Sequence, residues 1–99
     1  MSIWTHGRWT VKPGREEEFV ASSRDLAPTM REEVGAPLPT LLRDRERPNV
    51  FLTFGRGESI EAIEDFRAAA IPRISQMQHL LEAFQAFTLD EVAMTASQD

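Results

Sequence analysis

The sequence predicts a single α+β domain whose elements follow the order β-α-β-β-α-β. Its length of 99 residues suffices for one domain only. Four segments are predicted to be strands, and the segments that join the first to the second and the third to the fourth carry apolar residues at helical spacing. The expected strands are residues 3–11, 40–47, 50–55 and 86–94. The domain is expected to span residues 3–94, and residues 95–99 form a polar tail.

The first expected strand, residues 3–11, contains aromatic and β-branched residues and ends at Lys12-Pro13-Gly14. Because side chains alternate along a strand, its residues divide into two faces. One face carries Ile3, Thr5, Gly7, Trp9 and Val11, and the other carries Trp4, His6, Arg8 and Thr10.

A helical pattern begins at Arg15, with three glutamates in its first turn, where carboxylates favour the positive end of the helix dipole. Phe19, Ser23, Leu26 and Met30 follow helical spacing and form one stripe of this helix. Pro28 lies inside this pattern and is expected to kink the helix or end it one turn early. Gly35 is a natural terminator.

The next two strands are expected to form a hairpin around Pro48-Asn49. Residues 40–47 carry many charges, which favours an edge strand. Residues 50–55 are strongly apolar, which predicts a central strand covered on both faces.

Ser59 is a good N-cap for a second helical segment. Ala68-Ala69-Ala70 is expected to end that helix, and Pro72 is expected to open another short one. The last expected strand, residues 86–94, completes the domain.

This order is the ferredoxin-like, split βαβ arrangement, an antiparallel four-stranded sheet with its helices on one face. The other face would carry Trp4, His6 and Arg8 together with apolar residues of the third strand. An uncovered face of this kind is unfavourable in water, so we expect a homodimer packed face to face, a dimeric α+β barrel. The alternative is a monomer with a mixed polar face.

Composition limits the classes of partner. The chain has 16 acidic and 11 basic residues, a net charge of -5 that disfavours nucleic acid and anionic membranes. No apolar run approaches the roughly 20 residues of a membrane span. The absence of cysteine excludes disulfides and thiolate ligands and suits a reducing compartment. No signal-peptide pattern is seen at the N-terminus, and a cytoplasmic location is expected.

Three segments carry a family resemblance: residues 9–19, residues 49–55 and residues 58–66. Together they resemble the antibiotic biosynthesis monooxygenase family, and the resemblance covers nearly the whole chain. It implies a dimeric α+β barrel. Members of that family include cofactor-independent oxygenases acting on quinols or polyketide aromatics, and haem-degrading enzymes.

The working side chains of those relatives have few counterparts here. Haem-degrading members have an asparagine where Gly7 stands and a tryptophan near Phe66. Polyketide oxygenases have asparagine, tryptophan and tyrosine near Thr53, Gly57 and Ile63, respectively. The resemblance therefore implies the fold more strongly than the chemistry.

The resemblance also implies a pocket between sheet and helices, on the face that carries Gly7 and Thr53. Small residues on that face are expected to leave volume for a small apolar or aromatic ligand. They are Thr5, Gly7, Thr53, Gly55 and Gly57. The expected walls are Trp9, Phe51 and Phe66. The alternative is that helix side chains fill the space.

Two histidines are the candidate catalytic bases, because imidazole exchanges protons near neutral pH. His79 could reach the pocket from its helix, or it could be structural or solvated. His6 lies on the opposite face, where a hydrogen-bonded role at the dimer interface is the alternative. We expect no metal site and no bound cofactor.

The predicted function is that of a monooxygenase-like protein, without a bound cofactor, that acts on or binds a small aromatic or quinol-type molecule. One alternative is a non-catalytic small-molecule-binding dimer. A second is a haem-binding or haem-degrading protein, which Gly7 and Phe66 disfavour.

Overall fold

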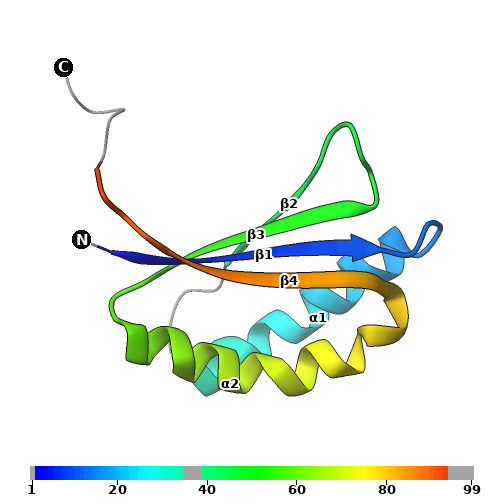
Figure 1. Cartoon of the computed structure of the whole chain (residues 1–99). Helices are drawn as coiled ribbons and strands as arrows, with labels where there is room; N and C mark the ends of the chain where they lie inside the picture. Colours follow the sequence, from blue (N-terminus) through cyan, green and yellow to red (C-terminus); the bar gives the residue numbers. More distant parts are fainter. Residues whose placement is uncertain (1, 35–38, 94–99) are drawn as a thin grey trace.

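The computed structural model describes residues 2–34 and 39–93, and within them the elements follow the predicted order (Figure 1). The elements are β1 (Ile3–Val11), α1 (Glu16–Val34), β2 (Thr40–Arg43), β3 (Val50–Gly57), α2 (Ile60–Gln76), the 3-10 helix η1 (Gln78–Leu80) and β4 (Leu81–Asp90). Gly35 and the predicted tail, residues 95–99, lie outside the described residues.

The four strands form one antiparallel sheet in the order β2-β3-β1-β4. Both helices lie on one face of this sheet, and the opposite face has no helix over it (Figure 1). The predicted ferredoxin-like fold is therefore confirmed. As expected, β3 is a central strand, but on the helix-free face Leu52 and Phe54 stay half-buried in the single chain.

The alternation predicted for β1 is also confirmed. Thr5, Gly7, Trp9 and Val11 are buried beneath the helices, whereas Arg8 on the other face is exposed. Gly7 pairs with Thr53 on β3 and with Ala86 on β4.

The predicted edge strand β2 is shorter than expected and ends at Arg43 rather than residue 47. The carboxylate of Asp44 accepts hydrogen bonds from the backbone N–H groups of Glu46 (2.8 Å) and Arg47 (3.1 Å). These bonds turn the chain and hold the pKa of Asp44 below its ordinary value. The hairpin to β3 rises above the sheet (Figure 1).

Of the two effects expected of Pro28, a kink or an early end, the early end is wrong, because α1 continues to Val34. An interior proline costs about 3 kcal/mol, mainly through one lost hydrogen bond and a local clash. Pro28 is exposed, however, and Met30 beyond it is buried. Packing of Met30 gives the chain a reason to remain helical past the proline.

The expected break within the second helix is also wrong. α2 runs without interruption from Ile60 to Gln76, through both the alanine run and Pro72. Alanine is the strongest helix former, and Ile74 packs against the core beyond the proline. The predicted N-cap is confirmed, since the Ser59 hydroxyl accepts from the backbone N–H of Ala62 (3.1 Å).

Strand β4 begins at Leu81, five residues earlier than expected, because α2 and η1 end immediately before it. It pairs with β1 over nearly its whole length, from Leu81 opposite Val11 to Asp90 opposite Ile3. The main core lies where β1, β3 and α1 meet the segment that runs from the C-cap of α2 through η1. Its buried members are Trp9, Val11, Phe19, Phe51, Met77 and Leu80.

Candidate functional site

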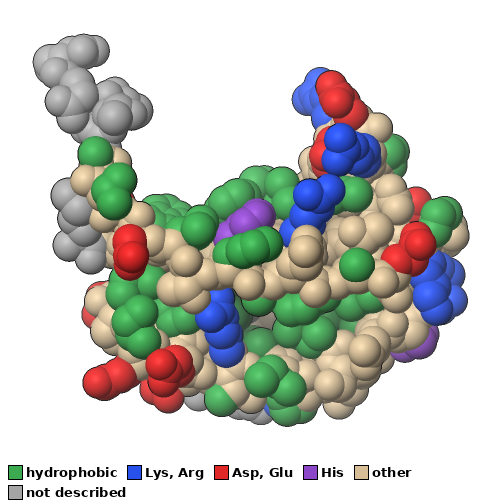
Figure 2. All heavy atoms as spheres, viewed as in Figure 1, with side chains coloured by type: hydrophobic (Ala, Val, Ile, Leu, Met, Phe, Trp, Pro, Cys, Tyr) green, Lys and Arg blue, Asp and Glu red, His purple; other side chains and the backbone are tan. Residues whose placement is uncertain are grey.

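A cavity of about 720 Å³ lies between the sheet and the helices. Residues of all four strands and of α1 and α2 contribute to its lining. Figure 2 shows a hollow at this level below the sheet, with mainly hydrophobic side chains around it and a basic side chain at its margin. The space predicted on the Gly7 and Thr53 face is therefore open rather than filled by helix side chains.

The sheet side of the cavity carries a partly buried polar pair. Trp9 Nε1 donates a hydrogen bond to Thr53 Oγ1 at 3.1 Å, and both residues line the cavity. A Cβ atom on Gly7 would lie 2.6 Å from that hydroxyl oxygen and 3.0 Å from Nε1. Gly7 therefore leaves room for the pair. The Thr53 hydroxyl, which accepts from Trp9, keeps its own O–H to donate to a ligand.

Gly55 and Gly57 do not contribute volume to the cavity, although the sequence suggested that they would. A Cβ on Gly57 would lie 2.5 Å from Cδ1 of Ile63, and one on Gly55 would lie 3.0 Å from Pro39. Those spaces are occupied, and neither glycine lines the cavity. Thr5, Gly7 and Thr53 do line the cavity as expected, and the other small lining residues are Ser23, Ala27, Ala70 and Ala86.

Aromatic rings form much of the wall. The Trp9 ring lies 4.1 Å from Phe84 and 5.5 Å from Phe19, centroid to centroid, and all three line the cavity together with Phe66. Phe51, expected as a wall, lies outside the lining. Its ring, only 2% exposed, packs in the core at 4.9 Å from Phe19.

Sequence reasoning missed Phe84 and Ala86 as lining residues because the last strand was expected to begin only at residue 86, which left Phe84 off the sheet. The alternation within 81–90 carries the signal. It places Phe84 opposite Trp9 and Ala86 opposite Gly7, all on the face beneath the helices.

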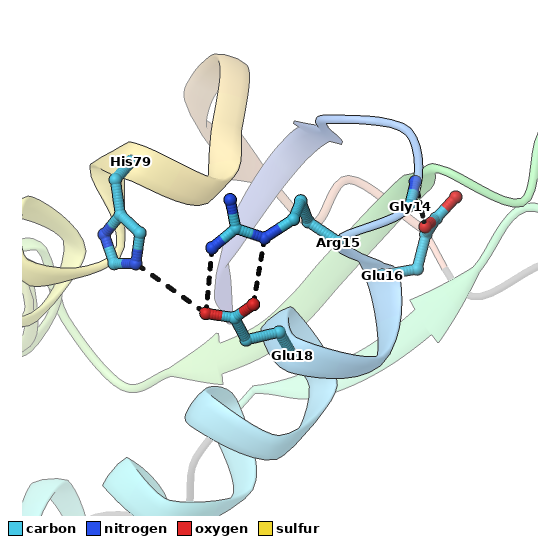
Figure 3. A network of polar contacts seen from close by, with 5 residues as sticks. All are labelled: Gly14, Arg15, Glu16, Glu18 and His79. Carbon is cyan, nitrogen blue, oxygen red and sulfur yellow. Dashed lines mark hydrogen bonds and ion pairs between the residues drawn. The ribbon is translucent and has the colours of Figure 1, made fainter.

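Neither histidine presents its ring to the cavity. His79 lies in η1, outside the lining, with its side chain 61% exposed and Nε2 3.9 Å from Glu18 Oε2 (Figure 3). His6 borders the cavity, but its ring stacks between Phe54 (4.4 Å) and Phe87 (5.5 Å) on the helix-free face. The catalytic roles considered for both residues remain predictions without support from this arrangement.

Glu18 is the centre of a small exposed network near η1 (Figure 3). Both of its carboxylate oxygens accept hydrogen bonds from the Arg15 guanidinium, each at 2.9 Å. The hydrogen bonds from Arg15 lower the pKa of the Glu18 carboxyl, and they raise the pKa of Arg15. Because the pKa of Glu18 is lowered in the folded chain, the pair stabilises the fold at pH values above the pKa that this carboxyl has in the unfolded chain. This contribution is lost as pH falls through the folded-state pKa.

Replacement of Arg15 by glutamine is expected to raise the pKa of Glu18 towards that of an ordinary glutamate, because the hydrogen bonds from Arg15 are the main cause of its lowering. Carbon-13 NMR titration of the side-chain carboxyl measures the change. His79→Ala serves as the comparison and should raise the same pKa less, since the charge of His79 is the smallest contributor. An unchanged Glu18 titration in Arg15→Gln would contradict this account.

The charged residues of the cavity lining are all arginines: Arg24, Arg31, Arg67 and Arg73. No aspartate or glutamate contributes to the lining as the structure describes it. Within residues 2–34 and 39–93, no three histidine or acidic side chains converge as metal ligands would. No helix in those residues has the length and apolar character needed to cross a membrane.

An antiparallel β-α-β-β-α-β sheet with both helices on one face defines the ferredoxin-like class of α+β domains, and here a cavity lies between the sheet and the helices. The family model for antibiotic biosynthesis monooxygenases matches residues 2–89, and the chain belongs to that family. A search of curated protein sequences finds no significant match.

Solved structures share the fold. A Shewanella oneidensis protein is 25% identical, with a TM-score of 0.77 and coverage of 91% of this chain and 90% of the other. A Bordetella bronchiseptica protein assigned to the antibiotic biosynthesis monooxygenases is 22% identical, with a TM-score of 0.77 and coverage of 93% and 98%. SnoaB, a cofactor-independent oxygenase of Streptomyces nogalater, is 19% identical, with a TM-score of 0.78 and coverage of 95% and 96%. Family and fold together support a monooxygenase-like or small-molecule-binding role.

Proposed function

We propose that this protein is a homodimer that binds a small aromatic molecule of the quinol or anthrone type in the cavity and oxidises it without a bound cofactor. The cavity itself carries the proposal: it is lined mainly by apolar side chains and has the Trp9–Thr53 pair on its sheet side. Apolar walls with few, well-placed polar groups are typical of sites for aromatic ligands. A solved structure of similar fold belongs to a cofactor-independent oxygenase.

In this proposal, the aromatic body of the ligand packs against Trp9, Phe84 and Phe66, and its oxygen accepts a hydrogen bond from the Thr53 hydroxyl. For an anthrone, the reaction class is the conversion of its activated CH2 group to C=O by O2, in which one oxygen atom enters the product and the other leaves as water. The protein's part is to bind and orient the substrate and to exclude bulk water.

The helix-free face of the sheet supports the proposed homodimer. Phe87 and Leu89 on this face are each about two-fifths exposed, and Trp4, His6 and Phe54 beside them are half-buried. Figure 2 shows hydrophobic and histidine side chains together along the upper surface of the sheet. A second copy that covers them would need to bury at least roughly 1,200 Å² in total.

A non-catalytic binding protein is the second candidate, and one observation favours it. Neither histidine ring reaches the cavity, and no described carboxylate lines it, so the lining offers no evident side-chain base. Oxygen uptake separates the two candidates: binding without oxygen consumption supports the second. His79→Ala is expected to leave any oxygen consumption unchanged, because His79 lies outside the lining.

Replacement of Phe66 by alanine tests the cavity directly. We expect the affinity for quinols and anthrones to fall roughly three- to tenfold, the loss of one aromatic contact. Binding is measured by quenching of Trp9 fluorescence in a Trp4→Phe background, so that the single remaining tryptophan lies in the cavity. Oxygen consumption by the same proteins is measured with an oxygen electrode.

The matched control is Ile60→Ala, which shortens an exposed side chain on the same helix outside the lining. It should leave binding unchanged. Equal affinities for Phe66→Ala and the unaltered protein would contradict the proposed site, as would the absence of any quenching by the whole series of ligands.

A further inference from the structure

The charge of the cavity lining is opposite in sign to the charge of the chain. The protein carries a net charge of -5, yet the charged residues of the lining are arginines only, contributed by α1 and α2. A composition with 16 acidic residues would not by itself predict a lining without a described carboxylate. The lining therefore has a distinct electrostatic character that the proposed aromatic ligand does not use.

Arg67 is held at the β4 side of the cavity by two short hydrogen bonds. Its Nη1 donates to Thr88 Oγ1 and its Nη2 donates to the Phe87 carbonyl, each at 2.7 Å. Both acceptors are uncharged, and within the described side chains no carboxylate forms an ion pair with Arg67. The guanidinium is thus fixed in place, its charge is not neutralised, and N–H groups remain for a further acceptor.

Arg24 and Arg31 line the same cavity from α1. They are seven residues apart, with Ala27 between them, so they lie two turns apart along one side of the helix. Both are exposed, and the described side chains include no carboxylate paired with either. They add positive potential to the cavity.

We infer that the ligand of this cavity is an aromatic anion, an aromatic body bearing a carboxylate or an ionised phenolic oxygen, whose charged group binds the Arg67 guanidinium at the β4 side. The inference rests on the proposed function, because it assigns the charge of the molecule that the cavity binds. Hydrogen bonds between arginine and an anionic oxygen are stronger than those between neutral groups. Arg24 and Arg31 attract the same charge from α1.

A pair of matched dyes tests the sign of the preferred charge. N-phenyl-1-naphthylamine is a neutral aromatic molecule, and 1-anilinonaphthalene-8-sulfonate is the same molecule with one sulfonate. We expect the sulfonate to bind roughly tenfold more tightly than the neutral dye, with a preference that weakens as salt is added. Dye fluorescence and calorimetry measure both affinities.

Two sets of variants locate the charge effect. Arg67→Gln is expected to reduce sulfonate affinity roughly tenfold and to change neutral-dye affinity less than about twofold, while Arg67→Lys retains part of the preference. Arg45→Gln removes one positive charge at the exposed β2–β3 turn, outside the lining, and should change neither affinity. The double variant Arg24→Gln/Arg31→Gln should also weaken sulfonate binding, and it leaves the contacts of Arg67 with β4 intact.

The cavity as the binding place is checked with Ala70→Phe, which adds a ring at a lining position and should abolish binding of both dyes. Retained sulfonate binding in that variant would assign the dye to another surface and overturn the inference. Equal affinities of the two dyes would overturn this inference, as would equal losses of sulfonate affinity in Arg67→Gln and Arg45→Gln. Either result would leave the proposed function standing. If neither dye nor any quinol binds the unaltered protein, the proposed function fails as well.

Discussion

Substitution of Phe54 by glutamate is expected to convert the proposed dimer into folded monomers. Phe54 lies on β3, on the helix-free face, with its ring stacked on His6 at 4.4 Å. In the single chain this position is only half-buried, so the new carboxylate can remain hydrated. In a face-to-face dimer it would be desolvated twice, once in each copy, at a cost of several kcal/mol per charge. A dissociation constant raised by at least about 1,000-fold follows.

Light scattering at micromolar concentration measures this effect, and circular dichroism confirms that the variant is folded. The matched control is Ala62→Glu, which introduces the same charge at an exposed position of α2 on the other side of the molecule. The control should keep the mass of the unaltered protein. A monomeric mass for the unaltered protein would remove the dimer from the proposal, and a Phe54→Glu variant that remains dimeric would place the interface elsewhere.

The features that the sequence predicted correctly are those in which a local pattern coincides with burial. Alternation from Ile3 to Val11 identified the buried face of β1 because a strand has a period of two residues whatever its partners. The Ser59 cap was predictable because its hydrogen bond reaches only three residues along the chain, to Ala62.

The errors at the two helical prolines have a common cause. Pro28 and Pro72 carry a local penalty that the sequence displays. The compensation, packing of Met30 and of Ile74 beyond them, depends on tertiary contacts that it does not display. Strand β4 was placed too late for the same reason, because its start depends on where α2 ends.

The candidate site was predictable only in part. The face that carries Gly7, Trp9 and Thr53 follows from alternation and family resemblance, but the hydrogen bond between Trp9 and Thr53 depends on the register between β1 and β3. The exclusion of the His79 ring depends on the orientation of the short helix η1. The arginines of the lining lie on the sides of α1 and α2. Nothing in the neighbouring sequence distinguishes Arg67 from an arginine that points into solvent.

Substitution of Gly7 by alanine is expected to destabilise the protein by about 2–4 kcal/mol and to weaken ligand binding. This loss of stability is opposite in direction to the general trend, because alanine in a strand is usually favoured over glycine by about 0.5–1 kcal/mol. Here the new Cβ would lie 2.6 Å from Thr53 Oγ1, 3.0 Å from Trp9 Nε1 and 3.2 Å from Phe84. The strand is central and cannot move aside, so the Trp9–Thr53 hydrogen bond must give way.

Gly14→Ala is the control for a glycine substitution without a clash. Gly14 has a φ of 90°, which costs alanine about 1–2 kcal/mol, but no atom lies within 4 Å of the added Cβ. Urea denaturation of both variants should therefore give the larger loss for Gly7→Ala, and only that variant should lose affinity for ligands of the cavity.

A double-mutant cycle shows whether the loss arises at the cavity pair. Thr53→Ala removes the oxygen that Cβ at position 7 would meet first, so Gly7→Ala/Thr53→Ala should be destabilised less than the sum of the two single variants, by at least about 1 kcal/mol. Strictly additive losses would mean that the clash with Thr53 is relieved elsewhere in the sheet. A loss smaller than the sum would identify the contact between β1 and β3 as the feature that requires glycine at position 7, and it would link the stability of the sheet to the shape of the cavity.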